Sequence, residues 1–262
     1  MSNLKLRDRV QSYQDAADHK LLARLPLIIC VNGRNFAKST ELLDKPYCAK
    51  FTECMLSSML KLCSEVDGSL FAYHFNDEIV LVSMNDQTVN TAPWYDNKIQ
   101  KICSATSAMV TQHFNKCAEA VNLDVVGDPI FTSQVFVVPN VFEAINILVY
   151  KQQANFHTSI QSACFYELLK KYDKHTIKEM TAGITIDEKI DLLNQECGVD
   201  FNEYPTAFRR GAACYKIPKV TSDGTMKNKW FVNTDLPIFT KDQSFVSNIF
   251  KHGADIFRQE SL

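Results

Sequence analysis

Hydrophobic residues in this chain form two patterns, short uninterrupted runs and longer stretches with helical spacing. The uninterrupted runs predict strands over 27–31, 70–75, 78–84 and 131–138. Between them, apolar residues recur every three or four positions and predict helices over about 46–66 and 95–115. The order of elements from 27 to 138 is therefore β-α-β-β-α-β.

Turn and capping residues set the expected limits of several elements. Pro46 suits the first turn of the first long helix, and Asp67-Gly68 follows its end. Asn140 followed by Glu143, and Thr185 followed by Glu188, have the spacing of helix N-terminal capping boxes. These predict helices up to about 172 and up to Gly198. A short amphipathic helix is expected over about 6–22, and strand-like runs over 212–217 and 230–232 flank a polar turn at 222–224.

The β-α-β-β-α-β order is that of the split βαβ, or ferredoxin-like, arrangement, an antiparallel sheet with two helices on one face. Polymerase palms use this layout, and so do many non-catalytic domains, so the order alone does not decide function. We expect an α+β protein. A palm-like catalytic-type domain with an N-terminal helix would span 1–140, and a helical and β-hairpin part packed on it would span 141–262.

The length, net charge and cysteine content of the chain limit the classes of protein to which it can belong. A chain of 262 residues can bury one sizeable core. Because the net charge is −2, any nucleic-acid site must be a local patch. The nine cysteines lack zinc-site spacing, which favours reduced, buried thiols and a cytoplasmic location. The polar N-terminus does not read as a secretory signal, and no apolar stretch approaches the ~18 residues that span a membrane.

The candidate catalytic residues lie at the end of the first apolar run and in the turn between the second and third runs. Asn32-Gly33-Arg34 follows the first run, and Asp77 and Glu78 occupy the tight turn between the next two. A carboxylate at a strand end, opposite a hairpin that offers another, is how a palm-type nucleotidyltransferase holds two Mg²⁺ ions. Here the first carboxylate position is Asn32, whose amide supplies no charge.

Several segments in sequence order resemble the tRNA(His) guanylyltransferase family, and within it the shorter guanylyltransferase-like proteins that repair tRNA 5′ ends. They are VNGRNF (31–36), KPY (45–47), NDE (76–78) and the stretches 92–115, 149–161, 207–216 and 230–239. The resemblance spans nearly the whole chain. It implies 3′-to-5′ nucleotide addition to tRNA with GTP or ATP and Mg²⁺, and assembly as a tetramer. No DNA or membrane partner is expected.

The resemblance also assigns roles to particular residues. The catalytic positions match Asp77, Asn32 and Glu78. The metal ligands it implies are Asp77, Asn32 and the backbone of Gly33. The positions that would hold the nucleotide and its phosphates are Gly33, Arg34, Lys45, Asn76, Lys98 and Lys101.

The chain departs from the family pattern at polar positions while the apolar frame is kept. The substituted positions are Cys30, Asn32, Asn76, Thr132, Gln134, Lys151, Ala154 and Thr158. We therefore expect a tRNA 5′-end nucleotidyltransferase-like protein with impaired activity. The alternative is an inactive member that binds tRNA or nucleotide, as a homo-tetramer or as the partner of an active paralogue. Whether Asn32 is natural or was introduced to trap a complex stays open.

Overall fold

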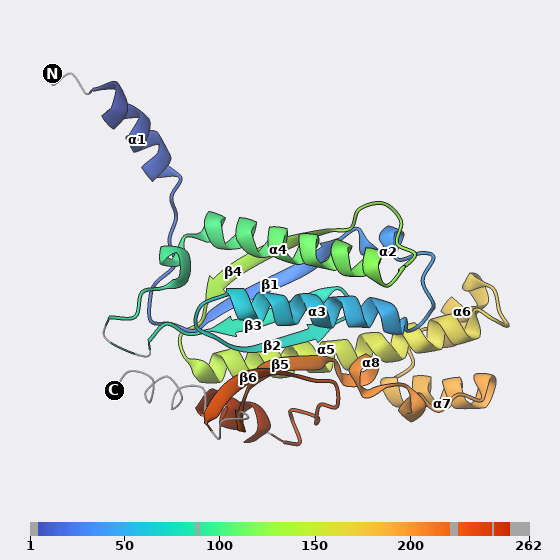
Figure 1. Ribbon diagram of the computed structural model, residues 1–262. Helices are drawn as coiled ribbons and strands as arrows, with labels where there is room; N and C mark the ends of the chain where they lie inside the picture. The colour runs from blue at the N-terminus through green and yellow to red at the C-terminus, as the bar shows by residue number, and fades with distance from the viewer. Residues whose placement is uncertain (1–4, 87, 89, 221–224, 243, 252–262) are drawn as a thin grey trace.

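One six-stranded antiparallel sheet forms the centre of the protein. The computed structural model describes residues 5–86, 88, 90–220, 225–242 and 244–251. The strands lie in the order β4-β1-β3-β2-β5-β6 (Figure 1). Their bounds are β1 (Leu27–Arg34), β2 (Ser69–Phe75), β3 (Glu78–Ser83), β4 (Ile130–Val137), β5 (Ala212–Val220) and β6 (Met226–Asn233).

Two long helices cover one face of the sheet, as the β-α-β-β-α-β order predicts. They are α3 (Ala49–Glu65) and α4 (Ile99–Ala120). Leu27, Ile29 and Val31 of β1 belong to the core beneath these helices. Successive side chains of a strand point to opposite faces, so the residues between them face the other side. The expected α+β, ferredoxin-like palm is confirmed.

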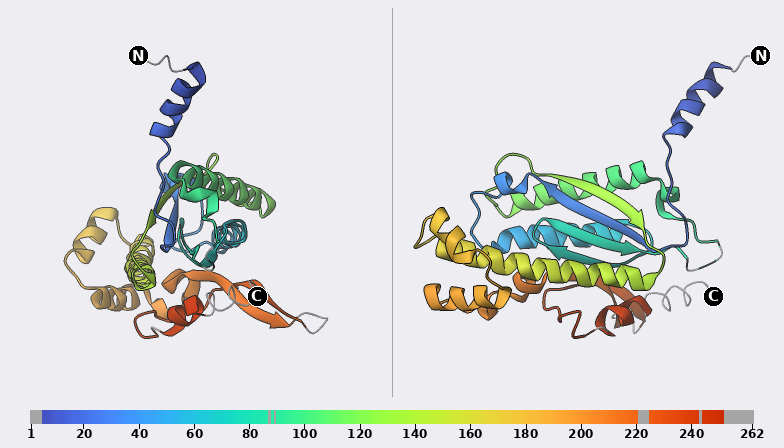
Figure 2. Two further views of the ribbon diagram at one scale, coloured as in Figure 1. Left: turned by 90° about the vertical axis from the view of Figure 1, so that its left-hand side faces the viewer. Right: turned by 180° about the vertical axis from the view of Figure 1, so that it is seen from behind.

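A third long helix, α5 (Val141–Leu168), lies across the opposite face of the sheet (Figure 2). It begins where expected, because the side chain of Asn140 accepts a hydrogen bond from the backbone N–H of Glu143 at 3.0 Å. Ile28 and Cys30 of β1 pack into the core on this face. The sheet is thus buried on both sides, with different partners on each.

The remaining helices are short and lie around this frame. They are α1 (Leu6–Ala16), α2 (Phe36–Ser39), α6 (Lys174–Thr181), α7 (Ile186–Cys197), α8 (Thr206–Arg210) and the 3-10 turns η1 (Trp94–Asn97) and η2 (Phe201–Glu203). The capping box of Thr185 and Glu188 is present in both directions at the start of α7. The helix α6 is not expected from the sequence, because it is only eight residues long and buries only Ile177.

Several expected helix limits are wrong. The helix expected to end near Asn115 continues to Ala120, and the one expected to end near Tyr172 ends at Leu168. The first helix ends at Ala16 rather than near Leu22, and none of its residues is buried. The helix expected from Pro46 begins at Ala49. The helix expected from Tyr95 begins at Ile99, because Tyr95 has a φ of 49° and cannot continue a right-handed helix.

The C-terminal strands join the sheet of the N-terminal half. β5 pairs with β2, and β6 pairs with β5 along its whole length. Both lie beyond residue 140, so strands from each side of the expected boundary belong to one sheet. The division of the chain at residue 140 stays a prediction.

Gln152 of α5 ties the segment after β6 to the rest of the protein. Its side chain is buried, and its amide nitrogen donates to the carbonyls of Arg210 at 3.3 Å and Pro237 at 3.0 Å. Its amide oxygen accepts from the backbone N–H of Phe239 at 2.7 Å. One side chain therefore satisfies three backbone groups that are buried or partly buried.

His74 of β2 is buried as a neutral side chain. Its Nε2 lies 2.8 Å from the carbonyl oxygen of Asn76, and Nδ1 has no partner among the described residues. Burial lowers the pKa of His74 to about 4, a shift that the Asn76 carbonyl opposes. The folded protein therefore resists protonation of this ring.

We predict that Gln152→Ala lowers the free energy of unfolding by about 3 kcal/mol, because buried backbone groups lose their partners. Its exposed neighbour offers a matched control, and Gln153→Ala should change stability by less than about 0.5 kcal/mol. Chemical denaturation measures both. Equal effects of the two substitutions would contradict the role of Gln152.

We also predict that stability falls as the pH is lowered from 7 to 5. Unfolded His74 takes up a proton near its ordinary pKa of 6.5, whereas the folded protein does so only near 4, so protons favour the unfolded state in between. This group alone accounts for a loss of about 2 kcal/mol. Chemical denaturation at each pH should show that the free energy of unfolding depends less steeply on pH in His74→Leu than in the unmodified chain. An unchanged slope would contradict the prediction.

Candidate functional site

The candidate site is built where β1 ends against the turn between β2 and β3. The backbone N–H of Gly33 donates to the carbonyl of Asp77 at 3.0 Å, and Asn32 lies opposite Glu78 in the register of β1 and β3. Asn76 supports the tight turn with a φ of 49°, a conformation that asparagine tolerates better than most residues. The pairing brings the candidate catalytic residues of both segments together.

Gly33 is required for space. A β-carbon there would lie 2.2 Å from the ring of Phe36, well inside van der Waals contact. That ring is buried, and its centroid lies 4.7 Å from that of Phe131 and 5.8 Å from that of Phe114. The close approach of Phe36 to Gly33 fixes the start of the chain segment that follows β1.

A pocket of about 230 Å³ lies between that segment, the Asn76-Asp77 turn and α5. Lys45 and Asp77 both line it. The other lining residues are Phe36, Ala37, Thr40, Leu43, Asp44, Pro46, Cys48, Phe51, Asn76, Ser162 and Tyr166. Sequence reasoning missed Thr40, Ser162 and Tyr166. The last two come from a turn of α5 beyond the last stretch that resembles the family there.

Three charged residues line this pocket: Asp44, which is exposed, Lys45 and Asp77. Burial raises the pKa of Asp77; the hydrogen bond of its own backbone N–H opposes the shift, and the charge of Glu78 adds to it. Burial lowers the pKa of Lys45. The Lys45 Nζ lies 3.4 Å from the Thr40 hydroxyl and 5.9 Å from the ring centroid of Tyr166. Lys45 is nevertheless exposed to solvent; the groups beside its ammonium are neutral, and no acidic side chain among the described residues forms an ion pair with it.

Glu78 forms an ion pair with Lys151 of α5. The Lys151 Nζ lies 2.5 Å from Oε1 of Glu78, and their side chains are 25% and 19% exposed. By strand alternation Glu78 shares the α5 face of the sheet with Asn32 and Cys30. Burial, reinforced by the charge of Glu78 and opposed by that of Lys151, raises the pKa of Cys30 to about 11. The charge of the second carboxylate is thus compensated from within the protein.

These side chains do not fit a pair of Mg²⁺ ions. The oxygen donors at the end of β1 are the carboxylate of Asp77, the neutral amide of Asn32 and the carbonyl of Gly33, while Glu78 is held by Lys151. Mg²⁺ in proteins is bound by carboxylates whose charge offsets its own. Within the described part of the chain, no group of three His, Cys, Asp or Glu residues is placed to hold a metal ion.

Two lysines expected to face a triphosphate do not join this group. Thr106 of α4 is level with the end of β1, since its hydroxyl lies 2.7 Å from that of Ser133, which pairs with Val31. Lys101 lies five residues earlier on α4, toward the opposite end of the sheet, and is exposed. The helix α4 also covers the face away from Asn32. Within one chain, neither Lys98 nor Lys101 reaches the pocket.

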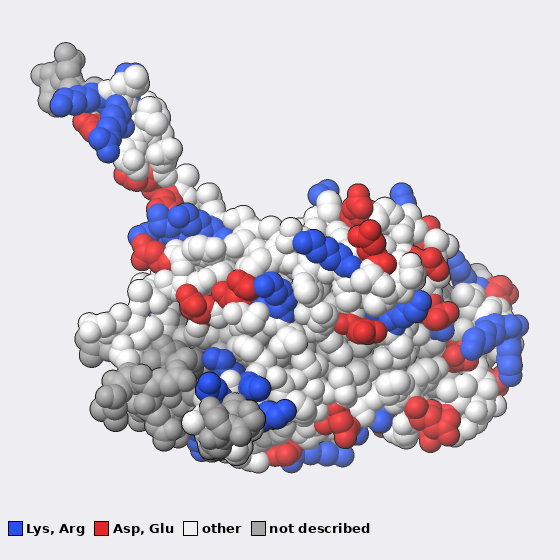
Figure 3. Space-filling model, in the orientation of Figure 1, with Lys and Arg blue, Asp and Glu red and all other residues white. Residues whose placement is uncertain are grey.

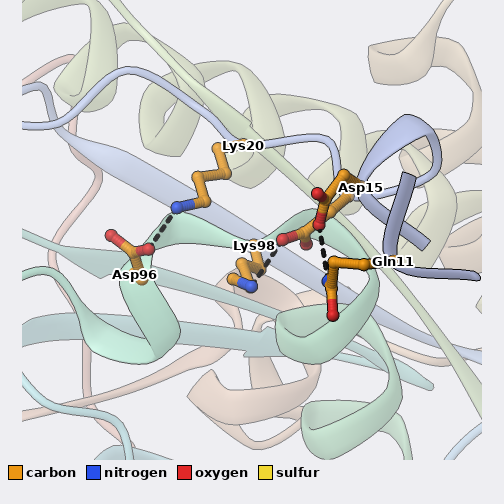
Figure 4. A network of polar contacts seen from close by, with 6 residues as sticks. Gln11, Asp15, Lys20, Asp96 and Lys98 are labelled. Atoms are coloured by element: carbon orange, nitrogen blue, oxygen red, sulfur yellow. Dashed lines mark hydrogen bonds and ion pairs between the residues drawn. The ribbon is translucent and has the colours of Figure 1, made fainter. Parts of the chain in front are cut away.

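Lys98 instead belongs to a polar network at the base of α1 (Figure 4). Its Nζ lies 2.5 Å from Oδ2 of Asp18, and Lys20 forms an ion pair with Asp96. The network holds the segment after α1 against the start of α4. Of the other expected nucleotide-binding residues, Lys45 and Asn76 line the pocket, and Arg34 is exposed at the end of β1.

Comparison with known proteins finds relatives that are named tRNA(His) guanylyltransferases. Residues 7–139 match the family model described as Thg1: tRNAHis guanylyltransferase. The chain is 22% identical over 227 residues to tRNA(His) guanylyltransferase 1 of Arabidopsis thaliana, and it is 21% identical over 206 residues to a probable tRNA(His) guanylyltransferase of Drosophila melanogaster. These matches cover 85% and 77% of this chain, but only 39% and 70% of the relatives.

Solved structures share the fold. A bacterial tRNA(His) guanylyltransferase-like protein in complex with ATP superposes with a TM-score of 0.81 at 24% identity, over 94% of this chain and 98% of that one. The tRNA(His) guanylyltransferase of Saccharomyces cerevisiae gives 0.70 at 15% identity, over 83% and 94%. The matching family model spans half of the sequence, and the chain belongs to the tRNAHis guanylyltransferase family.

Proposed function

We propose that this protein binds a nucleoside triphosphate in the Lys45–Asp77 pocket and adds nucleotides to tRNA 5′ ends in the 3′-to-5′ direction, at an impaired rate. The observation that carries the proposal is that Lys45 and Asp77 line one pocket, with Asp77 held beside the end of β1 by its backbone hydrogen bond with Gly33, in a member of this family. The related bacterial proteins have been solved in complex with ATP and with GTP, which supports GTP or ATP as the substrate.

The impaired rate follows from the charges at the site. In the proposed reaction the 5′ phosphate of tRNA is first activated by a nucleotide, and the 3′ hydroxyl of an incoming nucleotide then displaces the activating group. Stabilising the charge that develops on the phosphate is the main catalytic contribution in such transfers. Asn32 contributes no charge and Glu78 is neutralised by Lys151, so this chain lacks the carboxylates that would hold two Mg²⁺ ions.

A second candidate function is binding without chemistry. The same two features, Asn32 and the Lys151–Glu78 ion pair, favour an inactive family member that binds tRNA or nucleotide. It would act in the cytoplasm as a homo-tetramer, or in a hetero-oligomer with an active paralogue. All nine cysteines are free thiols, in keeping with a reducing compartment.

The surface offers a local contact for the RNA backbone. Lysines and arginines are interspersed with acidic residues over the face shown in Figure 3, and they gather beside the β5–β6 hairpin. Lys219 and Lys227 are exposed and lie opposite each other across this hairpin. Like charges placed directly opposite are unfavourable without a counter-charge, which a phosphate backbone supplies. None of the described helices is long and apolar enough to cross a membrane.

The proposed activity predicts slow transfer that one substitution accelerates. Labelled nucleotide is offered with a 5′-truncated tRNA to the unmodified chain and to Asn32→Asp, with Asp77→Asn as the negative control. We expect Asn32→Asp to raise the rate in Mg²⁺ by about 100-fold, because it restores a carboxylate that could hold Mg²⁺, whose charge stabilises the phosphates. Equal rates in the unmodified chain and Asn32→Asp would contradict the assigned role of Asn32. If neither chain transfers nucleotide but both bind tRNA, the second candidate function holds.

The pocket predicts which lysine binds phosphate. Lys45→Met should weaken binding of ATP by about tenfold or more, equivalent to roughly 1.4 kcal/mol, because an ammonium whose neighbouring groups are neutral is lost. Lys38→Met removes the same charge from an exposed position on α2 outside the pocket and serves as the matched control. Calorimetric titration measures both affinities. Equal losses in the two variants would place the triphosphate elsewhere.

A further inference from the structure

The charged groups around the end of β1 balance one another. The carboxylates are those of Asp44, Asp77 and Glu78, and the basic groups are Lys45 in the pocket, Lys151 across the sheet and the exposed Arg34 at the end of β1. Asn32 adds no charge between them. A site that recruits divalent cations instead concentrates carboxylates with no cation of the protein's own nearby. The charges here are those of a site whose carboxylates are already offset by basic side chains of the protein.

We propose that this pocket binds the phosphate groups of a nucleotide without a divalent cation, with the ammonium groups of the protein in place of metal ions. The inference rests on the proposed nucleotide-binding function and specifies its cation requirement. It commits to Lys45 as the group that contacts phosphate. Lys151 is the group that keeps Glu78 from acting as a metal ligand.

The Lys151–Glu78 ion pair is the stronger obstacle to a metal ion. Its atoms are 2.5 Å apart, and both side chains are mostly screened from solvent by the sheet and α5. An ion that took Glu78 as a ligand would leave the Lys151 ammonium without its partner in a partly buried position, which is strongly unfavourable. Asp77 alone cannot replace the missing charge, since its remaining neighbours are an amide and a backbone carbonyl.

The surroundings of Lys45 are suited to an anionic ligand. Its Nζ lies near the Thr40 hydroxyl and the Tyr166 ring, and no described carboxylate pairs with it. A phosphate oxygen in the pocket would form a charge-assisted hydrogen bond with this ammonium. Asp77 and the exposed Asp44 are the carboxylates of the pocket that would repel phosphate.

The effect of Asp77→Asn on ATP binding distinguishes metal-dependent binding from metal-free binding. If a metal ion bridges Asp77 and the phosphates, Asp77→Asn abolishes binding. If the nucleotide binds without metal, the same substitution removes a repulsive charge and leaves ATP affinity unchanged or increased.

The experiment is a calorimetric titration of the full chain with ATP, once in excess Mg²⁺ and once in EDTA. We expect the two dissociation constants to agree within about threefold, which is less than 1 kcal/mol. Asn32→Asp should bind ATP about tenfold more weakly in EDTA than in Mg²⁺, because the added carboxylate repels phosphate unless a cation offsets it. Asp77→Asn should bind in EDTA at least as tightly as the unmodified chain.

A second pair of variants tests the ion pair. Lys151→Met in the Asn32→Asp background frees Glu78 and should widen the difference between Mg²⁺ and EDTA further. Lys61→Met breaks the exposed ion pair with Glu65 and should leave the difference unchanged in that background. Far-ultraviolet circular dichroism confirms that each variant is folded before it is titrated.

The outcomes distinguish the inference from the function on which it rests. If the unmodified chain binds ATP in Mg²⁺ but not in EDTA, or if Asp77→Asn loses ATP binding, the inference of metal-free binding is overturned and the proposed function stays intact. Absence of ATP binding in both conditions would overturn the proposed function, and the inference with it. Agreement of the two dissociation constants with retained binding in Asp77→Asn supports the inference.

Discussion

The antiparallel pairing of β1 with β3 is the constraint on which the candidate site depends. It sets Asn32 opposite Glu78, and the hydrogen bond from Gly33 to the carbonyl of Asp77 closes the pair at its end. A shift of the register by one residue would turn Asn32 and Glu78 to opposite faces of the sheet. Burial of both faces, by α3 and α4 on one side and α5 on the other, excludes such a shift.

Because β1 and β3 are fixed, α5 decides the electrostatics of the site. The helix delivers Lys151 to Glu78 and Tyr166 to the vicinity of Lys45. A scaffold that in related enzymes is associated with nucleotide transfer is here neutralised by its own lysines. The same helix anchors the C-terminal segment through Gln152, so binding of a ligand at the pocket and packing of the tail share one rigid element.

The sequence predicts the parts of this protein that depend on local signals. The strand runs, the helical periods of α3 and α4, and the caps at Asn140 and Thr185 are visible because neighbouring residues determine them. Asp77, Asn32 and Lys45 are identified from their motifs. The ion pair of Glu78 with Lys151 joins residues 73 positions apart, and no pattern along the chain reveals it.

The same limit applies to Lys98 and Lys101, which do not line the pocket. Spacing on α4 shows that Lys98 and Lys101 share a helix face, but the direction of the helix relative to β1 decides which end of the sheet they reach. The three residues with positive φ before α4 and the network of Asp18, Lys20 and Asp96 set that position. The positions of Lys98 and Lys101 relative to β1 could therefore be found only from the three-dimensional structure.

The central claim is that the Lys45 ammonium, and no metal ion, contacts the phosphates of a nucleotide in the pocket beside the end of β1. The most direct measurement is a crystal structure of the full chain grown with ATP and Mn²⁺, with anomalous diffraction recorded at the manganese edge. The account predicts triphosphate density beside the Lys45 Nζ and no anomalous peak between Asn32 and Asp77, with Glu78 still paired to Lys151. An anomalous peak ligated by Asp77 and the Asn32 amide oxygen would contradict it.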